Sequence, residues 1–184
     1  ADCLDLVALG TVADVVPLDR NNRILVAAGL QRIRSGRARP GIAALLEVAG
    51  RDPTSVVASD LGFAVGPRLN AAGRLDDMSV GIECLLAPST AIARDYAGRL
   101  QQLNQDRRHI ERGMQQEALS LLENLPLQEQ DGSPPAAIAL YEPGWHQGVI
   151  GILASRVKDR LHRPTIVFAD AEPGGDELKG SARS

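Results

Sequence analysis

The feature that most limits what this chain can fold into is an uninterrupted helical pattern in its middle. The pattern opens at Pro88-Ser89-Thr90 and contains no further proline until Pro126. Over about 36 residues at about 1.5 Å each, such a helix would be roughly 54 Å long, which exceeds the diameter of a single domain. The sequence therefore predicts a connecting helix with a separate domain on either side.

Composition indicates a globular protein with an aliphatic core. Of the 184 residues, 44% are hydrophobic and only 3% are aromatic, which argues against an all-β sandwich. The net charge of −3 gives no overall attraction to nucleic acid, so any such contact would depend on local patches. Two arginine clusters could supply patches, and the alternative is that each is a solvated surface. The clusters are Arg32, Arg34, Arg37 and Arg39, and Arg107, Arg108 and Arg112.

Signals of localisation indicate a cytoplasmic protein. The sequence shows no signal peptide and no apolar run of about 18 residues, so neither secretion nor membrane insertion is expected. Cys3 and Cys84 lack metal-ligand spacing, and we expect two buried thiols in a reducing cytosol. Because the chain opens without a methionine, we also expect it to be a piece of a longer protein.

The first part of the chain has the apolar periodicity of helices, over 4–16, 22–35 and 40–48. β-Branched residues leave a strand possible over 4–16. Asp14 lies between two short apolar runs, so its carboxylate must be paired, act as a cap or bind a metal. The spacing alone favours a cap.

The segment 66–75 follows a helical stretch and is predicted to be a helix-breaking loop, because it opens with Gly66-Pro67. It carries Arg68, Asn70 and Arg74. Guanidinium groups bind phosphates and carboxylates through paired hydrogen bonds. The segment is therefore a candidate site for a phosphate or an acidic ligand, and the alternative is a purely structural loop.

After a polar linker over 128–135, the chain alternates strand, helix and strand, a pattern that favours parallel pairing of the strands. The three elements are expected over 137–141, 148–161 and 165–169. A third strand begins near Leu178. Glycines and the pair His146-Gln147 lie at the start of the helix, where backbone N–H groups can bind phosphate. The alternative is that the glycines only allow close packing of helix on strand.

Five segments carry motifs whose order is informative. They are 6–18, 68–74, 103–111, 144–156 and 180–184. The first of them ends with Gly10-Thr11-Val12-Ala13-Asp14-Val15-Val16-Pro17-Leu18. In this order they resemble the RecJ family of the DHH phosphoesterase superfamily. Five ordered matches over nearly the whole chain make the resemblance specific, although any one of them would be weak.

The resemblance implies an α/β fold in three parts. Residues 1–86 would be the C-terminal part of a DHH Rossmann-like catalytic domain, 87–126 a long connecting helix, and 135–184 the start of a DHH-associated α/β domain that binds substrate. The Asp-His-His triplet that supplies the other metal ligands of the family would lie upstream. We therefore expect the 184-residue chain alone to be inactive.

The resemblance also implies a single-strand-specific 5′-to-3′ DNA exonuclease of DNA repair and recombination, with two Mn²⁺ or Mg²⁺ ions at its centre. Asp14 would be a catalytic residue and a metal ligand. The residues that would contact DNA are Arg68, Asn70, Arg74, His146, Gln147, Ser181 and Arg183. Ala182 stands where the family usually has glycine. The expected partners are single-stranded DNA, a single-strand-binding protein and a RecQ-type helicase, with a monomeric protein and no membrane contact.

Two other functions remain open. A phosphodiesterase for short oligonucleotides or cyclic dinucleotides shares both domains and the metal ions. A RecJ-like protein without the metal ligands would be a binding module for DNA or for a replication complex. The long helix and the segment 66–75 favour a nuclease that acts on longer strands.

Overall fold

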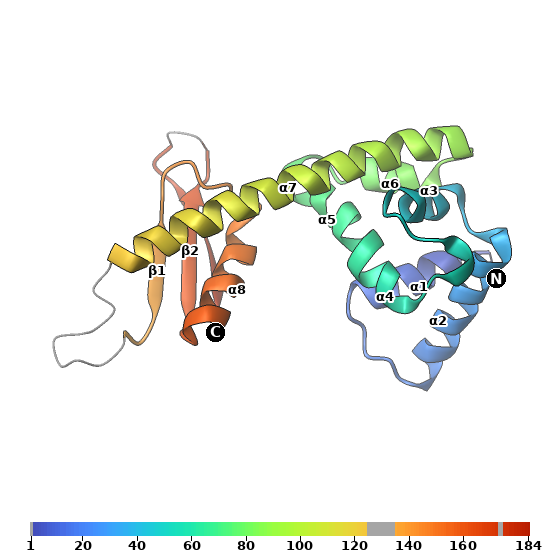
Figure 1. Cartoon of the computed structure of the whole chain (residues 1–184), viewed down its shortest axis with the longest axis horizontal. Coiled ribbons are helices and arrows are strands. Elements are labelled where there is room, and N and C mark those ends of the chain that lie inside the picture. The colour runs from blue at the N-terminus through green and yellow to red at the C-terminus, as the bar shows by residue number, and fades with distance from the viewer. Residues whose placement is uncertain (1, 125–134, 173–174) are drawn as a thin grey trace. The chain divides into compact units, whose positions relative to one another are not determined.

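The computed structural model describes residues 2–124, 135–172 and 175–184. It divides into two compact units, Ala1–Gln105 (unit 1) and Asp106–Ser184 (unit 2). The predicted long helix is confirmed as α7 (Thr90–Asn124), which has 35 residues and contributes to both units (Figure 1). The linker expected at 128–135 lies almost entirely outside the described residues.

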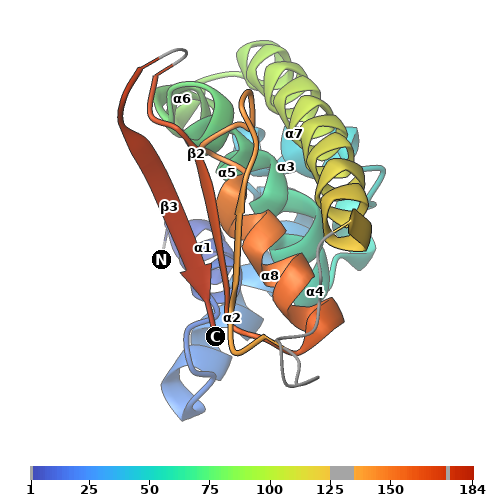
Figure 2. The same ribbon diagram turned by 90° about the vertical axis from the view of Figure 1, so that its left-hand side faces the viewer.

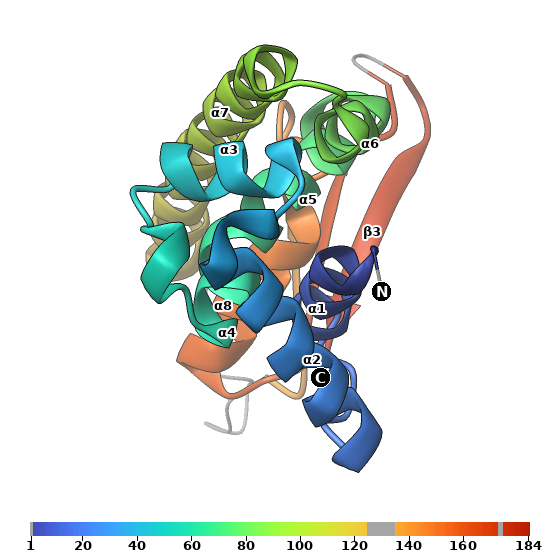
Figure 3. The ribbon, with the colours of Figure 1, turned by 90° about the vertical axis from the view of Figure 1, so that its right-hand side faces the viewer.

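The described residues of unit 1 form helices and helical turns (Figure 3). Their buried side chains make an aliphatic core. The first segment is helical, so a strand there is excluded. The elements before α7 are α1 (Leu4–Ala13), α2 (Arg20–Arg32), η1 (Ile33–Arg37), α3 (Pro40–Val48), η2 (Pro53–Ser55), α4 (Ala58–Asp60), η3 (Leu61–Val65), α5 (Gly66–Leu75) and α6 (Ser79–Leu86). From α7, the small side chains of Ala93 and Ala97 enter this core together with Leu100.

The prediction of a helix-breaking loop over 66–75 is wrong, because these residues form helix α5. Pro67 lies in the first turn of α5, where the missing N–H would have had no intrahelical partner. The preceding π turn, η3, absorbs the irregularity, since the Gly66 N–H donates to the carbonyl of Leu61 five residues back. Proline and glycine therefore shape the entry to α5 without ending the helical run.

Unit 2 contains a small mixed sheet with one helix against it (Figure 2). Its elements after α7 are β1 (Ile138–Tyr141), α8 (Ile150–Leu161), β2 (Thr165–Asp170) and β3 (Leu178–Arg183). The strand order is β1-β2-β3, and β1 and β2 are parallel, as the alternation predicts. The third strand pairs antiparallel with β2. The buried members of β1 and β2 include Leu140 and Val167, which are paired in register.

The two cysteines differ in environment. Cys84 is fully buried, and burial raises the pKa of its thiol to about 11. The prediction that Cys3 is also buried is wrong, because Cys3 lies just before α1 on the surface, where Arg39 Nη2 is 3.2 Å from its Sγ.

Among the helices in the described part of the chain, none combines the length and apolar character needed to cross a bilayer.

Candidate nucleic-acid interface and the Asp14 turn

Asp14 occupies the turn that ends α1. The turn is closed by backbone bonds, with the Val16 N–H donating to Thr11 O at 3.0 Å and the Val15 N–H donating to Val12 O at 3.3 Å. This is the Schellman pattern, which places one residue in the left-handed region, here Val15 with φ of 54°. The carboxylate of Asp14 is exposed and accepts no hydrogen bond from a described residue. The side-chain cap that spacing favoured is therefore absent, since main-chain groups close the turn.

The end of α1 packs against the π turn and the start of α5. A Cβ atom at Gly62 would lie 3.2 Å from Cγ1 of Val12, and one at Gly66 would lie 3.4 Å from Cβ of Ala13. Glycine at these positions lets the helices approach closely. Asp14 follows Ala13 directly, so its turn adjoins the helix that carries the predicted DNA-contacting arginines. Single π turns within helices are frequent at functional sites.

The helical form of α5 separates the polar residues that the sequence placed in one loop. Arg68 is buried, with Nε donating to Gln101 Oε1 at 2.8 Å and Nη1 donating to the carbonyl of Ala64. It therefore joins α5 to α7 within unit 1. Asn70 and Arg74 are exposed and lie four residues apart, on one face of α5. Of the three predicted DNA-contacting residues of α5, Asn70 and Arg74 are therefore the two that face solvent.

The described residues do not form a metal centre by themselves. No group of three or more His, Cys, Asp or Glu side chains in the described part of the chain is arranged to hold an ion. A pair of divalent ions needs several oxygen ligands around each ion, and Asp14 offers one carboxylate. The remaining ligands of any centre that includes Asp14 would have to come from outside the described residues.

In unit 2 the predicted residues gather at the first turn of α8. A Cβ atom at Gly151 would lie 3.0 Å from Ser181 Oγ and 3.1 Å from Arg183 Nη2, so both side chains lie against the helix. His146 is half-buried in the loop that precedes α8, and its Nδ1 accepts from the Gly148 N–H at 3.0 Å. Gln147 is exposed, and its Oε1 accepts from the ammonium of Lys179.

The alternation of β3 explains why these side chains meet. Lys179, Ser181 and Arg183 are at every second position, and they pair with residues of β2 whose side chains are buried. They therefore share the face of the sheet on which α8 packs. Sequence reasoning missed Lys179, although the period of two from Ser181 and Arg183 could have revealed it. The glycine at position 151 is what permits this close approach.

This arrangement is suited to an anion. The N-terminus of a helix carries partial positive charge, and the first turn of α8 contains no acidic residue that would oppose it. Arg183 adds a guanidinium, with Nη1 donating to Ser181 Oγ at 3.2 Å, and Lys179 adds an ammonium. We refer to the first turn of α8 with Gln147, Lys179, Ser181 and Arg183 as the α8 anion site.

On the opposite face of the sheet, Tyr141 Oη donates to Asp170 Oδ1 at 2.8 Å. This hydrogen bond, followed by slight desolvation and the charges of Asp170 and Glu142, raises the pKa of Tyr141. The phenol therefore stays neutral at physiological pH and links the carboxyl ends of β1 and β2. It lies away from the α8 anion site, because Tyr141 and Leu140 point to opposite faces.

The fold and the site together define the class of domain at the C-terminal end of the chain: the DHHA1 domain family matches residues 134–184. Over the whole chain, the similarity is to RecJ. It is 64% identical over 185 residues to the single-stranded-DNA-specific exonuclease RecJ of Dickeya dadantii and 62% identical over 184 residues to that of Escherichia coli. Both matches cover 100% of this chain and 31% of the relative.

A solved structure gives the same result. The crystal structure of RecJ from Thermus thermophilus in complex with Mn²⁺ matches with a TM-score of 0.81 and 34% sequence identity, over 100% of this chain and 25% of that one. Over its whole length the chain is therefore similar to RecJ in sequence and in fold. It spans about a third of the length of the curated relatives named above.

Proposed function

We propose that this chain is part of a metal-dependent single-stranded-DNA exonuclease, in which unit 2 holds the DNA backbone and unit 1 contributes Asp14 to the catalytic centre. The observation that carries the proposal is the α8 anion site. The first turn of α8, the ammonium of Lys179 and the guanidinium of Arg183 lie on the same face of the sheet, and Gly151 lets Ser181 and Arg183 approach the helix. The relatives named single-stranded-DNA-specific exonuclease support DNA as the source of the phosphate.

Several finer features belong to the same proposal and rest on the family resemblance. They include digestion in the 5′-to-3′ direction and a centre with two Mn²⁺ or Mg²⁺ ions. The protein would act as a cytoplasmic monomer in DNA repair and recombination. Its partners would be a single-strand-binding protein and a RecQ-type helicase. Solved relatives bound to Mn²⁺ and to Mg²⁺ support the choice of metals. When bound, such ions would activate a water and offset charge on the scissile phosphate.

The residues of this chain have distinct parts in the proposal. Arg183 donates to phosphate oxygens, and Ser181 orients its guanidinium through their 3.2 Å contact. On α5, Asn70 and Arg74 contact the strand from their exposed face, while buried Arg68 fixes α5 against Gln101. His146 holds the loop before α8 through its bond from Gly148, so that Gln147 faces the DNA. Asp14 supplies one carboxylate ligand.

The test is single-strand binding by the chain, measured by fluorescence anisotropy with labelled oligothymidylate at several salt concentrations. Arg183→Gln should weaken binding, and it should reduce the slope of log affinity against log salt by about 0.7, the value for one phosphate contact on a single strand. The matched control is Arg160→Gln, which removes the same charge from the exposed last turn of α8. Equal slopes for Arg183→Gln and Arg160→Gln would contradict the proposal.

A second variant probes the geometry. Gly151→Ala places a methyl group against the flexible ends of Ser181 and Arg183, so the fold can adjust while the anion site narrows. We expect weaker DNA binding without a lowered unfolding midpoint, because alanine also favours the helix more than glycine does. Unchanged affinity would show that no phosphate approaches this turn of α8.

A further inference from the structure

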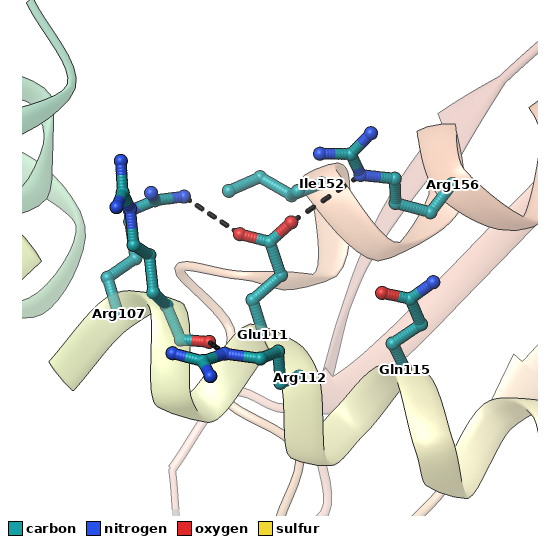
Figure 4. Close-up of a pocket in the computed structure, with 7 residues that line it drawn as sticks. Arg107, Glu111, Arg112, Gln115, Ile152 and Arg156 are labelled. Carbon is teal, nitrogen blue, oxygen red and sulfur yellow. Dashed lines mark hydrogen bonds and ion pairs between the residues drawn. The ribbon is translucent and has the colours of Figure 1, made fainter. Parts of the chain in front are cut away.

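Unit 2 contains a second basic feature, which the proposed function does not use. A cavity of about 670 Å³ is lined by Arg107, Arg108, Glu111, Arg112 and Gln115 of α7 and by Ile152 and Arg156 of α8 (Figure 4). We call these seven residues the arginine pocket. It contains the second arginine cluster of the sequence and adds Arg156, which comes from a distant part of the chain. All seven residues belong to unit 2.

The charges of the arginine pocket favour an anion. Four of the seven described lining residues are arginines, and Glu111 is the only one of the seven with a negative charge. The Glu111 carboxylate is mostly buried and accepts from Arg107 Nη1 at 3.0 Å, while Arg156 Nε lies 3.5 Å away on its other side (Figure 4). One carboxylate thus fixes two guanidinium groups from two helices and leaves a large excess of positive charge.

The arginine side chains are also pre-organised. Arg112 Nε donates to the backbone carbonyl of Arg108 at 3.1 Å, which holds the side chain along α7. Arg108 and Arg112 are exposed, whereas Arg107 and Glu111 form the inner layer. Glu111 thus positions Arg107 and Arg156, and the carbonyl of Arg108 positions Arg112. A site with three arginines held in this way can bind an oxyanion with less loss of side-chain freedom.

The arginine pocket adjoins the α8 anion site. Gly151 lies against Ser181 and Arg183, and the next residue, Ile152, lines the pocket. The two sites therefore occupy neighbouring faces of the same turn of α8, because successive residues of a helix are about 100° apart. A ligand that carries a row of phosphates can reach both sites.

We propose that the arginine pocket is a second phosphate subsite, which binds the backbone of the same single strand beyond the α8 anion site. This rests on the proposed function, since the strand is the ligand of the α8 anion site. An acidic peptide is the other class of polyanion. It fits less well, because Ile152 is the only aliphatic residue among the seven.

The experiment measures how tightly the 184-residue chain binds oligothymidylates of two lengths, about 4 and about 16 nucleotides. These lengths bracket common single-strand site sizes. Arg108→Gln and Arg112→Gln each remove an exposed charge of the pocket, and Arg160→Gln removes one elsewhere in unit 2. For the long strand, each pocket variant should lower affinity several-fold and reduce the salt slope by about 0.7. The short strand, held by the α8 anion site, should bind all three variants equally. Circular dichroism checks that each variant keeps its helical content.

The outcomes separate the two proposals. If Arg183→Gln weakens binding of both strands while Arg112→Gln and Arg160→Gln behave alike, the pocket is not a phosphate subsite and the proposed function stands. If the wild-type chain binds neither strand, both proposals fail. If a polyglutamate peptide binds with a dependence on Arg112 while the DNA salt slope does not change, the pocket binds acidic protein segments and the proposal is overturned.

Discussion

At the scale of single residues, the most unusual position is Val15, directly after Asp14. It is 86% exposed and has a φ of 54°. A β-branched residue is rarely found in the left-handed region, where helices usually place glycine. Its conformation therefore costs free energy that no burial of its side chain offsets. Strain of this kind is common beside functional groups, and it fixes the direction in which the Asp14 turn leaves α1.

We expect Val15→Gly to increase the free energy of unfolding by about 0.5–1 kcal/mol. Removing Cβ relieves the left-handed strain, and the greater freedom of glycine in the unfolded state offsets part of the gain. Urea denaturation followed by circular dichroism measures the change. Val15→Ala, which keeps Cβ, is the matched control and should increase the free energy of unfolding by less than Val15→Gly does. A less stable glycine variant would mean that the Val15 side chain makes a stabilising contact.

The two thiols should differ in reactivity and in their effect on stability. With a thiol-specific reagent at pH 8, we expect the native chain to react at Cys3 and the denatured chain at both cysteines, because Cys84 is buried and its thiol pKa is about 11. Below about pH 9 Cys84 is neutral in both states. As the pH rises from 9 towards 11, the unfolded thiol ionises first, so this group makes the folded state progressively less stable. Cys84→Ser should remove that part of the pH dependence, and two reactive thiols in the native chain would contradict the assignment.

At the scale of elements, periodicity in the sequence predicted α7, the β-α-β order of unit 2 and the parallel pairing of β1 with β2. The prediction from sequence failed at α5, because the pair Gly66-Pro67 usually ends a helix. Here a π turn before Gly66 lets the helical run continue, and this turn depends on packing against α1. The sequence also could not show that Arg68 is buried, since its partner Gln101 lies 33 residues away. The residues of the α8 anion site could not be grouped from sequence alone, because their meeting depends on how β3 pairs with β2. That register places Lys179 beside Gln147.

Packing between elements is tested by two glycines that differ in surroundings. A Cβ atom at Gly41 in α3 would overlap the backbone of Cys84 in α6, whereas one at Gly10 in α1 would meet nothing within 4 Å. We expect Gly41→Ala to destabilise the fold by more than about 2 kcal/mol, because a helix backbone cannot move aside cheaply. Gly10→Ala should stabilise it by about 0.5–1 kcal/mol through helix propensity. Thermal unfolding of both variants gives the comparison, and equal shifts would show that α3 and α6 are not in close contact.

At the scale of the whole molecule, the two units carry different kinds of chemistry. The described part of unit 2 gathers arginine and lysine side chains in the arginine pocket and at the first turn of α8, an arrangement that suits anion binding. In unit 1 the predicted metal ligand Asp14 has an exposed carboxylate, and no group of three or more possible ligands among the described residues is arranged to hold an ion. This chain therefore contains more of the proposed DNA-binding surface than of the proposed hydrolytic centre.

We accordingly expect the 184-residue chain to bind single-stranded DNA and to release no nucleotides from it. Hydrolysis of a phosphodiester by metal ions needs each ion held in a fixed position by several ligands, and one carboxylate cannot provide them. The assay follows nucleotide release from a labelled single strand in Mn²⁺, with full-length RecJ of Escherichia coli as the positive control. Asp14→Ala should bind the strand as the wild-type chain does, and both should remain at the background rate. Release by the wild-type chain above the rate of Asp14→Ala would show that these residues do complete a metal centre.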